Sequence, residues 1–184
     1  DVLQLQAVEK PTPKDNEVLI KIHATTVTAA DCELRRSNTP NMFRLLGLIR
    51  PGPIVIGQEL AGEIEAVGKK VTRFQEGNQV IGWSGLRLGT YAEYICLSEK
   101  AVLAIKPPTI TYEEAAPLAV GGLDAVYCLR KAHIQSGQKV LINGAGGSIG
   151  AFAVQIAKSL GAEVTGIDSA VKLDMLRAIG ADDV

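Results

Sequence analysis

The sequence predicts an α/β protein with an additional β-rich part: a β-rich domain over residues 1–110, followed by the first half of an α/β domain with a doubly wound parallel sheet. Two observations support this prediction. Before residue 110, short segments rich in β-branched residues alternate with turn signals that contain proline, glycine and asparagine. After residue 138, an apolar strand leads into a glycine-rich turn, a periodic helix and a second strand.

The β-rich part contains four segments with the composition of strands, at residues 17–27, 60–67, 79–83 and 90–97. A small β-barrel or a set of packed sheets is expected from their length and spacing. One helical insert is expected near residues 30–46.

A helical region over residues 111–137 is predicted to connect the two parts. Pro107 and Pro108 end the β-rich part, and Thr111 and Glu114 have the spacing of a capping box, in which each side chain bonds the backbone of the other residue. The pattern predicts a helix over residues 115–129, with Pro117 in or near its first turn.

Residues 138–184 begin with the most informative feature of the chain, a turn with the frame Gly144-x-x-Gly147-x-x-Gly150. Ile149 occupies the place where the third glycine of a GxGxxG pattern would fall. Glycines let the chain turn sharply and approach a pyrophosphate closely, and the following helix offers free N–H groups to its charge. A glycine turn that only packs tightly is the alternative interpretation.

An acidic residue follows the second strand of this unit. Asp168 lies 21 residues after Gly147, where a carboxylate can accept hydrogen bonds from the ribose hydroxyls of a dinucleotide. This acid favours NADH, because it would repel the 2′-phosphate of NADPH. Ser169 and Lys172 could instead hold that phosphate. The predicted cofactor-binding residues of the turn and of this second strand end are Gly144, Ala145, Gly147, Ser148, Ile149, Gly150, Asp168, Ser169 and Lys172.

Composition limits the classes of protein that remain. A net charge of −1 over 184 residues argues against nucleic-acid or membrane partners, and no apolar run reaches the length of a membrane span. Cys32, Cys96 and Cys128 are odd in number and share no CxxC spacing. We expect a reduced, cytoplasmic protein with a small-molecule substrate. The chain stops where a third strand should begin, so we also expect a piece of a longer protein.

Several motifs occur in a fixed order before the glycine turn: Gly57-Gln-Glu-Leu-Ala-Gly62, Glu65-Ala-Val-Gly68 and Gly89-Thr-Tyr-Ala-Glu-Tyr94. In this order the chain resembles the medium-chain dehydrogenase/reductase superfamily, and within it the zinc-independent quinone oxidoreductase-like branch. The resemblance implies a GroES-like N-terminal domain, a truncated Rossmann domain, hydride transfer from NADPH or NADH, and a homodimer. Its zinc-free members often use NADPH, so the resemblance leads us to expect NADPH rather than NADH, against the indication of Asp168.

The chain departs from the zinc-dependent relatives at the three positions that hold catalytic zinc. By motif these positions fall on Thr28, Gln58 and Val120, and none of these side chains supplies a thiolate or an imidazole. No metal is expected. Without a Lewis acid, the resemblance implies easily reduced acceptors, either quinones or α,β-unsaturated carbonyls.

The candidate catalytic residues are Asp31, Thr28 and Gln58. Thr28 and Asp31 match the segment that lies near the nicotinamide in the zinc-free relatives, and Gln58 replaces the ligand histidine of the zinc-dependent ones. Asp31 could orient the substrate or a water molecule, or it could cap the next helix. Gln58 could donate an amide N–H to a substrate oxygen. Asp124 is a further candidate for contact with the cofactor, and a solvated helix position is its alternative. Two other functions stay open: a nucleotide-binding structural or regulatory protein without turnover, and an alcohol dehydrogenase-like enzyme.

Overall fold

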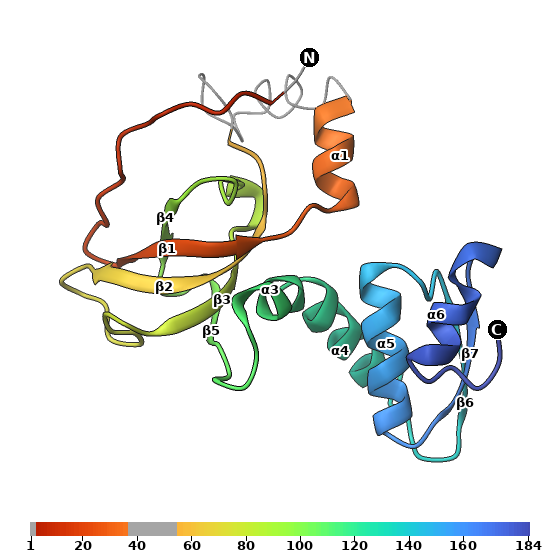
Figure 1. Ribbon diagram of the computed structural model, residues 1–184. Helices are drawn as coiled ribbons and strands as arrows, with labels where there is room; N and C mark the ends of the chain where they lie inside the picture. The colour runs from red at the N-terminus through yellow and green to blue at the C-terminus, as the bar shows by residue number, and fades with distance from the viewer. Residues whose placement is uncertain (1–2, 37–54) are drawn as a thin grey trace. The chain divides into compact units, whose positions relative to one another are not determined.

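The computed structural model describes residues 3–36 and 55–184 (Figure 1). The chain divides into two compact units, Asp1–Ala116 and Pro117–Val184, which are described separately below. The division falls inside the region predicted to connect the two domains. Among the described residues, no helix is long and apolar enough to cross a membrane.

The first unit is built on a five-stranded antiparallel sheet with the strand order β4-β1-β2-β3-β5. Its strands are β1 (Glu17–Thr25), β2 (Glu59–Val67), β3 (Gln79–Trp83), β4 (Tyr94–Ser98) and β5 (Val102–Ile105). The predicted segments correspond to β1 to β4, whereas β5 was not predicted. β4 begins four residues later than predicted, because the Thr90 and Tyr91 amides bond the carbonyls of Gly57 and Ile56 instead of a neighbouring strand.

Large aliphatic side chains from all five strands form the core of this unit. Burial of such a side chain stabilises the fold by about 1.5–3 kcal/mol, so this cluster holds the sheet in its curled form. The buried members are Val18, Ile20, Leu60, Ile64, Val80, Leu97 and Leu103.

The helices differ from the prediction in one respect. The capping box is confirmed: Thr111 Oγ1 accepts the Glu114 amide at 3.2 Å, and Glu114 Oε2 accepts the Thr111 amide at 2.9 Å. The continuous helix over 115–129 is wrong. The structure has α3 (Tyr112–Ala115), a 3₁₀ turn (Ala116–Leu118) and then α4 (Gly121–Lys131). Pro117 has no N–H to continue the helix, and two glycines follow at the start of α4.

Helix α1 (Ala29–Arg36) covers the first part of the helical insert predicted near residues 30–46. The remainder of that prediction lies outside the described residues.

The second unit is a βαβ arrangement of β6 (Lys139–Asn143), α5 (Ser148–Ser159) and β7 (Glu163–Ile167), followed by a 3₁₀ turn (Ala170–Lys172) and α6 (Leu173–Ala178). β6 and β7 pair in parallel, and Asp183 forms a further parallel bridge with Thr165 of β7. A third strand position, parallel to β7, therefore begins at Asp183. The order of β6, β7 and this third position is the strand order found in one half of a doubly wound sheet.

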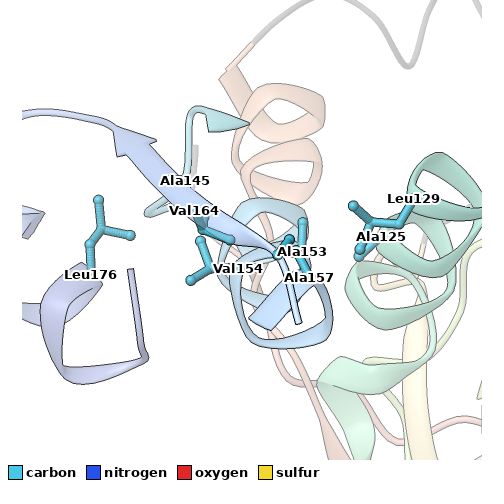
Figure 2. Packing of buried hydrophobic residues seen from close by; sticks show 9 residues of the cluster. Ala125, Leu129, Ala145, Ala153, Val154, Ala157, Val164 and Leu176 are labelled. Carbon is cyan, nitrogen blue, oxygen red and sulfur yellow. The ribbon is translucent and has the colours of Figure 1, made fainter. Parts of the chain in front are cut away.

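Small side chains bring the helices of this unit close together. Figure 2 shows Ala153 and Ala157 of α5 beside Ala125 and Leu129 of α4. A side chain at Gly121 of α4 would place its Cβ 2.4 Å from Ser148 Oγ. The packing of α4 on α5 therefore depends on the absence of larger side chains.

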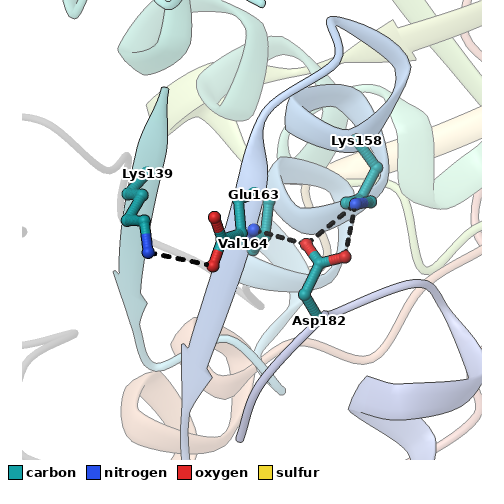
Figure 3. A network of polar contacts seen from close by, with 5 residues as sticks. All are labelled: Lys139, Lys158, Glu163, Val164 and Asp182. Carbon is teal, nitrogen blue, oxygen red and sulfur yellow. Dashed lines mark hydrogen bonds and ion pairs between the residues drawn. The ribbon is translucent and has the colours of Figure 1, made fainter. Parts of the chain in front are cut away.

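A polar network joins the end of the chain to β7 (Figure 3). Asp182 accepts hydrogen bonds from Lys158 Nζ at 2.7 and 2.8 Å and from the Val164 amide at 2.6 Å. The ion pair with Lys158 and the bond from Val164 hold the pKa of Asp182 below its ordinary value of 3.8.

Replacing Asp182 with asparagine is expected to lower the free energy of unfolding at pH 7. A carboxyl whose pKa is lowered on folding stabilises the protein above its unfolded pKa, and this contribution is lost as the pH falls through the folded pKa. The urea midpoint of Asp182→Asn should therefore lie below that of the wild type at pH 7, and the two midpoints should converge as the pH is lowered below 3.8. Asp174→Asn is the matched control, since the Asp174 side chain is fully exposed in its pair with Arg177. Equal shifts in both variants would contradict the prediction.

Candidate functional site: a glycine turn and a buried carboxylate

The glycine turn between β6 and α5 is tight and held by backbone bonds. The amides of Gly144 and Ala145 both donate to the carbonyl of Ile167, at 2.9 and 3.1 Å. Gly144 has a φ of +74°, and a Cβ at Gly150 would lie 2.2 Å from the Gly144 carbonyl oxygen. Glycine is therefore required at both ends of the frame, by conformation at Gly144 and by close packing at Gly150.

The turn presents the N-terminus of α5 to solvent. Gly147 is the N-cap and has no side chain to occupy the first amides of the helix. Ser148 and Ile149 are exposed in this first turn. Uncapped N–H groups and the helix dipole together favour an anion, so the residues present fit the pyrophosphate of a dinucleotide.

Two of the predicted cofactor residues have more limited roles than the sequence suggested. Ala145 is fully buried in the core of the second unit and its amide donates to the Ile167 carbonyl, so its contact with a ligand stays a prediction. The Ser148 hydroxyl lies against Gly121 of α4. Asp124 is exposed in the first turn of α4, where a carboxylate is favourable to the helix dipole, and its contact with a cofactor stays a prediction.

Asp168 lies directly after β7 and is anchored by backbone groups. Its Oδ2 accepts the Gly146 amide at 2.8 Å, and its Oδ1 accepts the Ser169 amide at 2.7 Å. The bonds from Ser169 and Gly146 hold the pKa of Asp168 below its ordinary value, so the carboxylate is ionised at neutral pH. Lys172 Nζ lies 3.4 Å from Oδ1, and its aliphatic stem crosses Gly146, where a Cβ would be 2.4 Å from Lys172 Cδ.

In the first unit, Thr28 and Asp31 form the cap of α1. Thr28 is the N-cap, because its carbonyl accepts the Cys32 amide. Asp31 Oδ2 accepts both the Thr28 amide at 2.9 Å and the Thr28 hydroxyl at 2.6 Å, and the Asp31 amide is 3.3 Å from Thr28 Oγ1. The capping alternative for Asp31 is thus observed, with Asp31 as the third helical residue rather than the N-cap.

Asp31 also reaches the segment that carries Gln58. Its Oδ1 accepts the Gly57 amide at 3.2 Å, although the two residues are 26 positions apart. Gln58 is held beside them: its Nε2 donates to the Gly85 carbonyl at 3.3 Å, and its own carbonyl accepts the Ser84 amide at 2.8 Å. One amide hydrogen of the Gln58 side chain remains for another acceptor.

Tyr91 is a residue that the sequence analysis did not assign to the site. Its hydroxyl is buried and has no hydrogen-bond partner. Its ring packs so closely on Gly57 that a Cβ there would lie 2.3 Å from Tyr91 Cδ1. Burial and the negative charge of Asp31 raise the pKa of Tyr91 to about 12. Gly57 and Tyr91 each stand in one of the motifs quoted from the sequence, but no pattern in the sequence indicates that the two residues meet.

A shallow hollow with a volume of about 410 Å³ lies beside Tyr91 on this unit. Its walls come from the end of β1 and from the segment that precedes β4. The lining residues are Ile22, His23, Ala24, Thr25, Val27, Thr90, Tyr91, Ala92 and Glu93.

Hydrogen bonds of polar side chains join the end of β1 to β2 and to the segment that precedes β4. The Thr25 hydroxyl donates to the Glu59 carbonyl at 2.7 Å and lies 3.0 Å from the Thr90 hydroxyl. Glu59 is 2 % exposed, and its carboxylate accepts the Thr26 hydroxyl. Within residues 3–36 and 55–184, no group of three or more histidine, cysteine, aspartate and glutamate side chains is arranged to hold a metal ion.

A β-rich unit with a buried polar site, joined to a βαβ unit with a glycine-rich turn at the N-terminus of its helix, is the arrangement found in two-domain dinucleotide-binding proteins. Residues 14–107 match the alcohol dehydrogenase GroES-like domain. The chain belongs to that family and, within the medium-chain dehydrogenase/reductase superfamily, to the quinone oxidoreductase-like branch. The predicted fold class, a GroES-like domain followed by part of a Rossmann domain, is confirmed.

Known quinone oxidoreductases and alcohol dehydrogenases are similar to this chain in sequence or structure. A quinone oxidoreductase from Sus scrofa is 38 % identical over 168 residues, which cover 90 % of this chain and 48 % of the relative. An NAD-dependent alcohol dehydrogenase from Sulfurisphaera tokodaii is 32 % identical over 99 % of this chain and 60 % of its own length. The solved quinone oxidoreductase of Coxiella burnetii superimposes with a TM-score of 0.86 at 29 % identity, over 99 % of this chain and 57 % of that structure. The chain therefore spans about half of the relatives it matches.

Proposed function

We propose that the protein is an NAD(P)H-dependent oxidoreductase that reduces a quinone or an α,β-unsaturated carbonyl compound. The observation that carries this proposal is the uncapped N-terminus of α5 behind the Gly144–Gly150 turn, with the ionised Asp168 at the end of the neighbouring strand. Pyrophosphate at the helix and ribose at the acid are the contacts that this pair of features makes with a dinucleotide.

We further propose that the reaction uses no catalytic zinc. Thr28, Gln58 and Val120 occupy the positions that correspond by motif to the zinc ligands of the metal-dependent relatives, and they offer a hydroxyl, an amide and an alkyl group. These groups are poor ligands for Zn²⁺ compared with cysteine and histidine. Elemental analysis of the active full-length protein tests this proposal. One zinc per chain, lost together with the activity when a chelator is added, would overturn the zinc-free reaction.

The chemistry then depends on binding and orientation. A nicotinamide held by the glycine turn would supply the hydride, and solvent would supply the proton that completes the two-electron reduction of the acceptor. In the first unit, the Thr28 hydroxyl already donates to Asp31, whereas Gln58 retains one side-chain N–H. Gln58 is therefore the residue that we propose to bind the acceptor oxygen.

Stopped-flow oxidation of NADPH and NADH by the full-length protein, with a panel of quinones and enals, tests the activity. Turnover with at least one acceptor class is expected. Cofactor binding without turnover across the whole panel would favour the nucleotide-binding protein without activity. Alcohol oxidation that exceeds all reductions would favour the alcohol dehydrogenase-like alternative.

The anchored carboxylate of Asp168 leads us to propose NADH as the preferred cofactor, although the family resemblance favours NADPH. Two backbone amides fix the ionised group, whereas Lys172 is half-exposed and reaches it only at 3.4 Å. Asp168→Asn should raise the NADPH/NADH ratio of kcat/KM by about tenfold, which corresponds to roughly 1.4 kcal/mol of removed repulsion. Lys172→Ala should change the ratio in the opposite direction. A wild type with a strong preference for NADPH would contradict the proposal.

The homodimer and the cytoplasmic location stay predictions from the sequence.

A further inference from the structure

We propose that Asp31 is a positioning residue: it fixes the segment that carries Thr28 against the segment that carries Gln58, and it exchanges no proton with the substrate. This inference rests on the proposed function for its kinetic consequence. Its structural content does not depend on that function and can be tested separately.

The first argument is the use of the lone pairs of the carboxylate. Asp31 is 2 % exposed. Its Oδ2 accepts two hydrogen bonds from Thr28, and its Oδ1 accepts one from the Gly57 amide. A group with three of its acceptor positions occupied by fixed protein donors is poorly placed to accept a proton from a substrate or from water.

The second argument is the protonation state of Tyr91, whose hydroxyl senses the charge of Asp31. Tyr91 carries a buried hydroxyl without a hydrogen-bond partner, and the charge of Asp31 contributes to the raised pKa of that hydroxyl. With a pKa of about 12, Tyr91 stays protonated at neutral pH and acts as a hydrogen-bond donor rather than as an acid. At neutral pH this hydroxyl therefore neither takes a proton from Asp31 nor supplies one to it.

The third argument is the way the Gly57 segment is held. The Thr90 amide donates to the Gly57 carbonyl at 3.3 Å, and the Tyr91 amide donates to the Ile56 carbonyl at 2.9 Å. The Tyr91 ring and the Thr90 hydroxyl occupy the space of a Gly57 side chain. Asp31 supplies the bond from α1 that completes this arrangement, directly beside Gln58.

Loss of the bond should therefore shift Gln58 relative to Thr28. Displacement of an orienting group by about 1 Å can cost about 10²-fold in rate. A carboxamide in place of the carboxylate keeps the size of the side chain, yet its NH₂ group must face either the Thr28 donors or the Gly57 amide. Asp31→Asn is therefore the informative variant.

The control is Glu99→Gln in the same unit. The Glu99 carboxylate also accepts two backbone amides, from Thr72 at 2.8 Å and Arg73 at 3.0 Å, and the residue is 8 % exposed. It therefore reproduces the structural loss of a buried carboxylate without touching Thr28, Gly57 or Gln58.

Steady-state kinetics of both full-length variants test the inference. For Asp31→Asn we expect kcat to fall by about 10- to 100-fold, with the KM for the cofactor unchanged and with the shape of the pH profile of kcat/KM retained. For Glu99→Gln we expect a similar fall in the thermal midpoint and a kcat within about twofold of the wild type. Loss of one limb of the pH profile in Asp31→Asn would show proton exchange and overturn the inference. Equal kcat in the two variants would also overturn it.

Amide hydrogen exchange gives a readout that needs no turnover. The Gly57 amide should exchange faster in Asp31→Asn than in the wild type, and Glu99→Gln should leave it unchanged.

If Asp31→Asn does not fold, Thr28→Val replaces it, since this variant keeps the Thr28 amide but loses the hydroxyl bond to Asp31. Thr28→Val should then lower kcat by a smaller factor. Unchanged exchange and unchanged kcat would refute the positioning role even if the proposed activity is correct, whereas a wild type without turnover would refute only the activity.

Discussion

Replacing Gly150 with alanine is expected to abolish dinucleotide binding and to destabilise the second unit. The new Cβ would lie 2.2 Å from the Gly144 carbonyl oxygen and 2.6 Å from Ala145 Cα. Both are backbone atoms, so no side-chain rotation relieves the collision, and α5 must move away from the turn. Overpacking of this kind costs about 1–3 kcal/mol or more. The free amides of α5 would then lose their alignment with the pyrophosphate.

Fluorescence titration with NADH and a thermal unfolding scan of the same preparation measure the two effects. The Kd should rise by at least about 100-fold, a loss of roughly 2.7 kcal/mol or more in binding. Gly122→Ala is the matched control, because its nearest neighbour would be Leu118 at 4.0 Å in a helix where alanine is favoured. That variant should bind as the wild type does and unfold at the same or a higher temperature. Wild-type affinity in Gly150→Ala would contradict the geometry of the turn.

The glycine turn could be predicted from the sequence because all of its determinants are local. Gly144, Gly147 and Gly150 lie within one strand-to-helix connection, and Asp168 follows at the end of the next strand. The capping box of Thr111 and Glu114 is equally local. In the capping box the short spacing determines two hydrogen bonds to the backbone, and the structure contains both.

The arrangement around Asp31 could not be predicted in the same way. The bond from Gly57 joins residues 26 positions apart, and the approach of Tyr91 to Gly57 joins another distant pair. No periodicity encodes such contacts, because they depend on how β1, β2 and the loop before β4 come together. The sequence could therefore name Asp31 and Gln58 as candidates, but it could not show that Asp31 bonds the segment that carries Gln58.

The broken helix after residue 115 has a different cause. Apolar periodicity favoured a continuous helix, and this preference continues across Pro117. The missing N–H of the proline and the two glycines at the start of α4 outweigh it. The break coincides with the boundary between the two compact units.

Gly57→Ala is expected to have the second large effect, this time in the first unit. Gly57 has a φ of +92°, which is unfavourable for alanine, and the new Cβ would lie 2.3 Å from the Tyr91 ring and 2.4 Å from Thr90 Oγ1. The backbone strain alone costs about 1 kcal/mol, and displacement of the half-buried Tyr91 ring adds about 1–3 kcal/mol. We therefore expect a fall of about 2–4 kcal/mol in the free energy of unfolding and a fall in kcat of at least about tenfold, because Gln58 moves with Gly57.

Gly77→Ala separates the two contributions. Gly77 has a similar φ of +81° in the same unit, but a Cβ there would meet nothing within 4 Å. This variant should show the strain without the collision, about 1 kcal/mol in urea unfolding, and should retain the wild-type kcat. The difference between the two variants then measures how tightly Tyr91 and Thr90 close on Gly57. If both variants lose the same stability and Gly57→Ala keeps its kcat, the Tyr91 ring is free to move and does not hold the Gln58 segment in place.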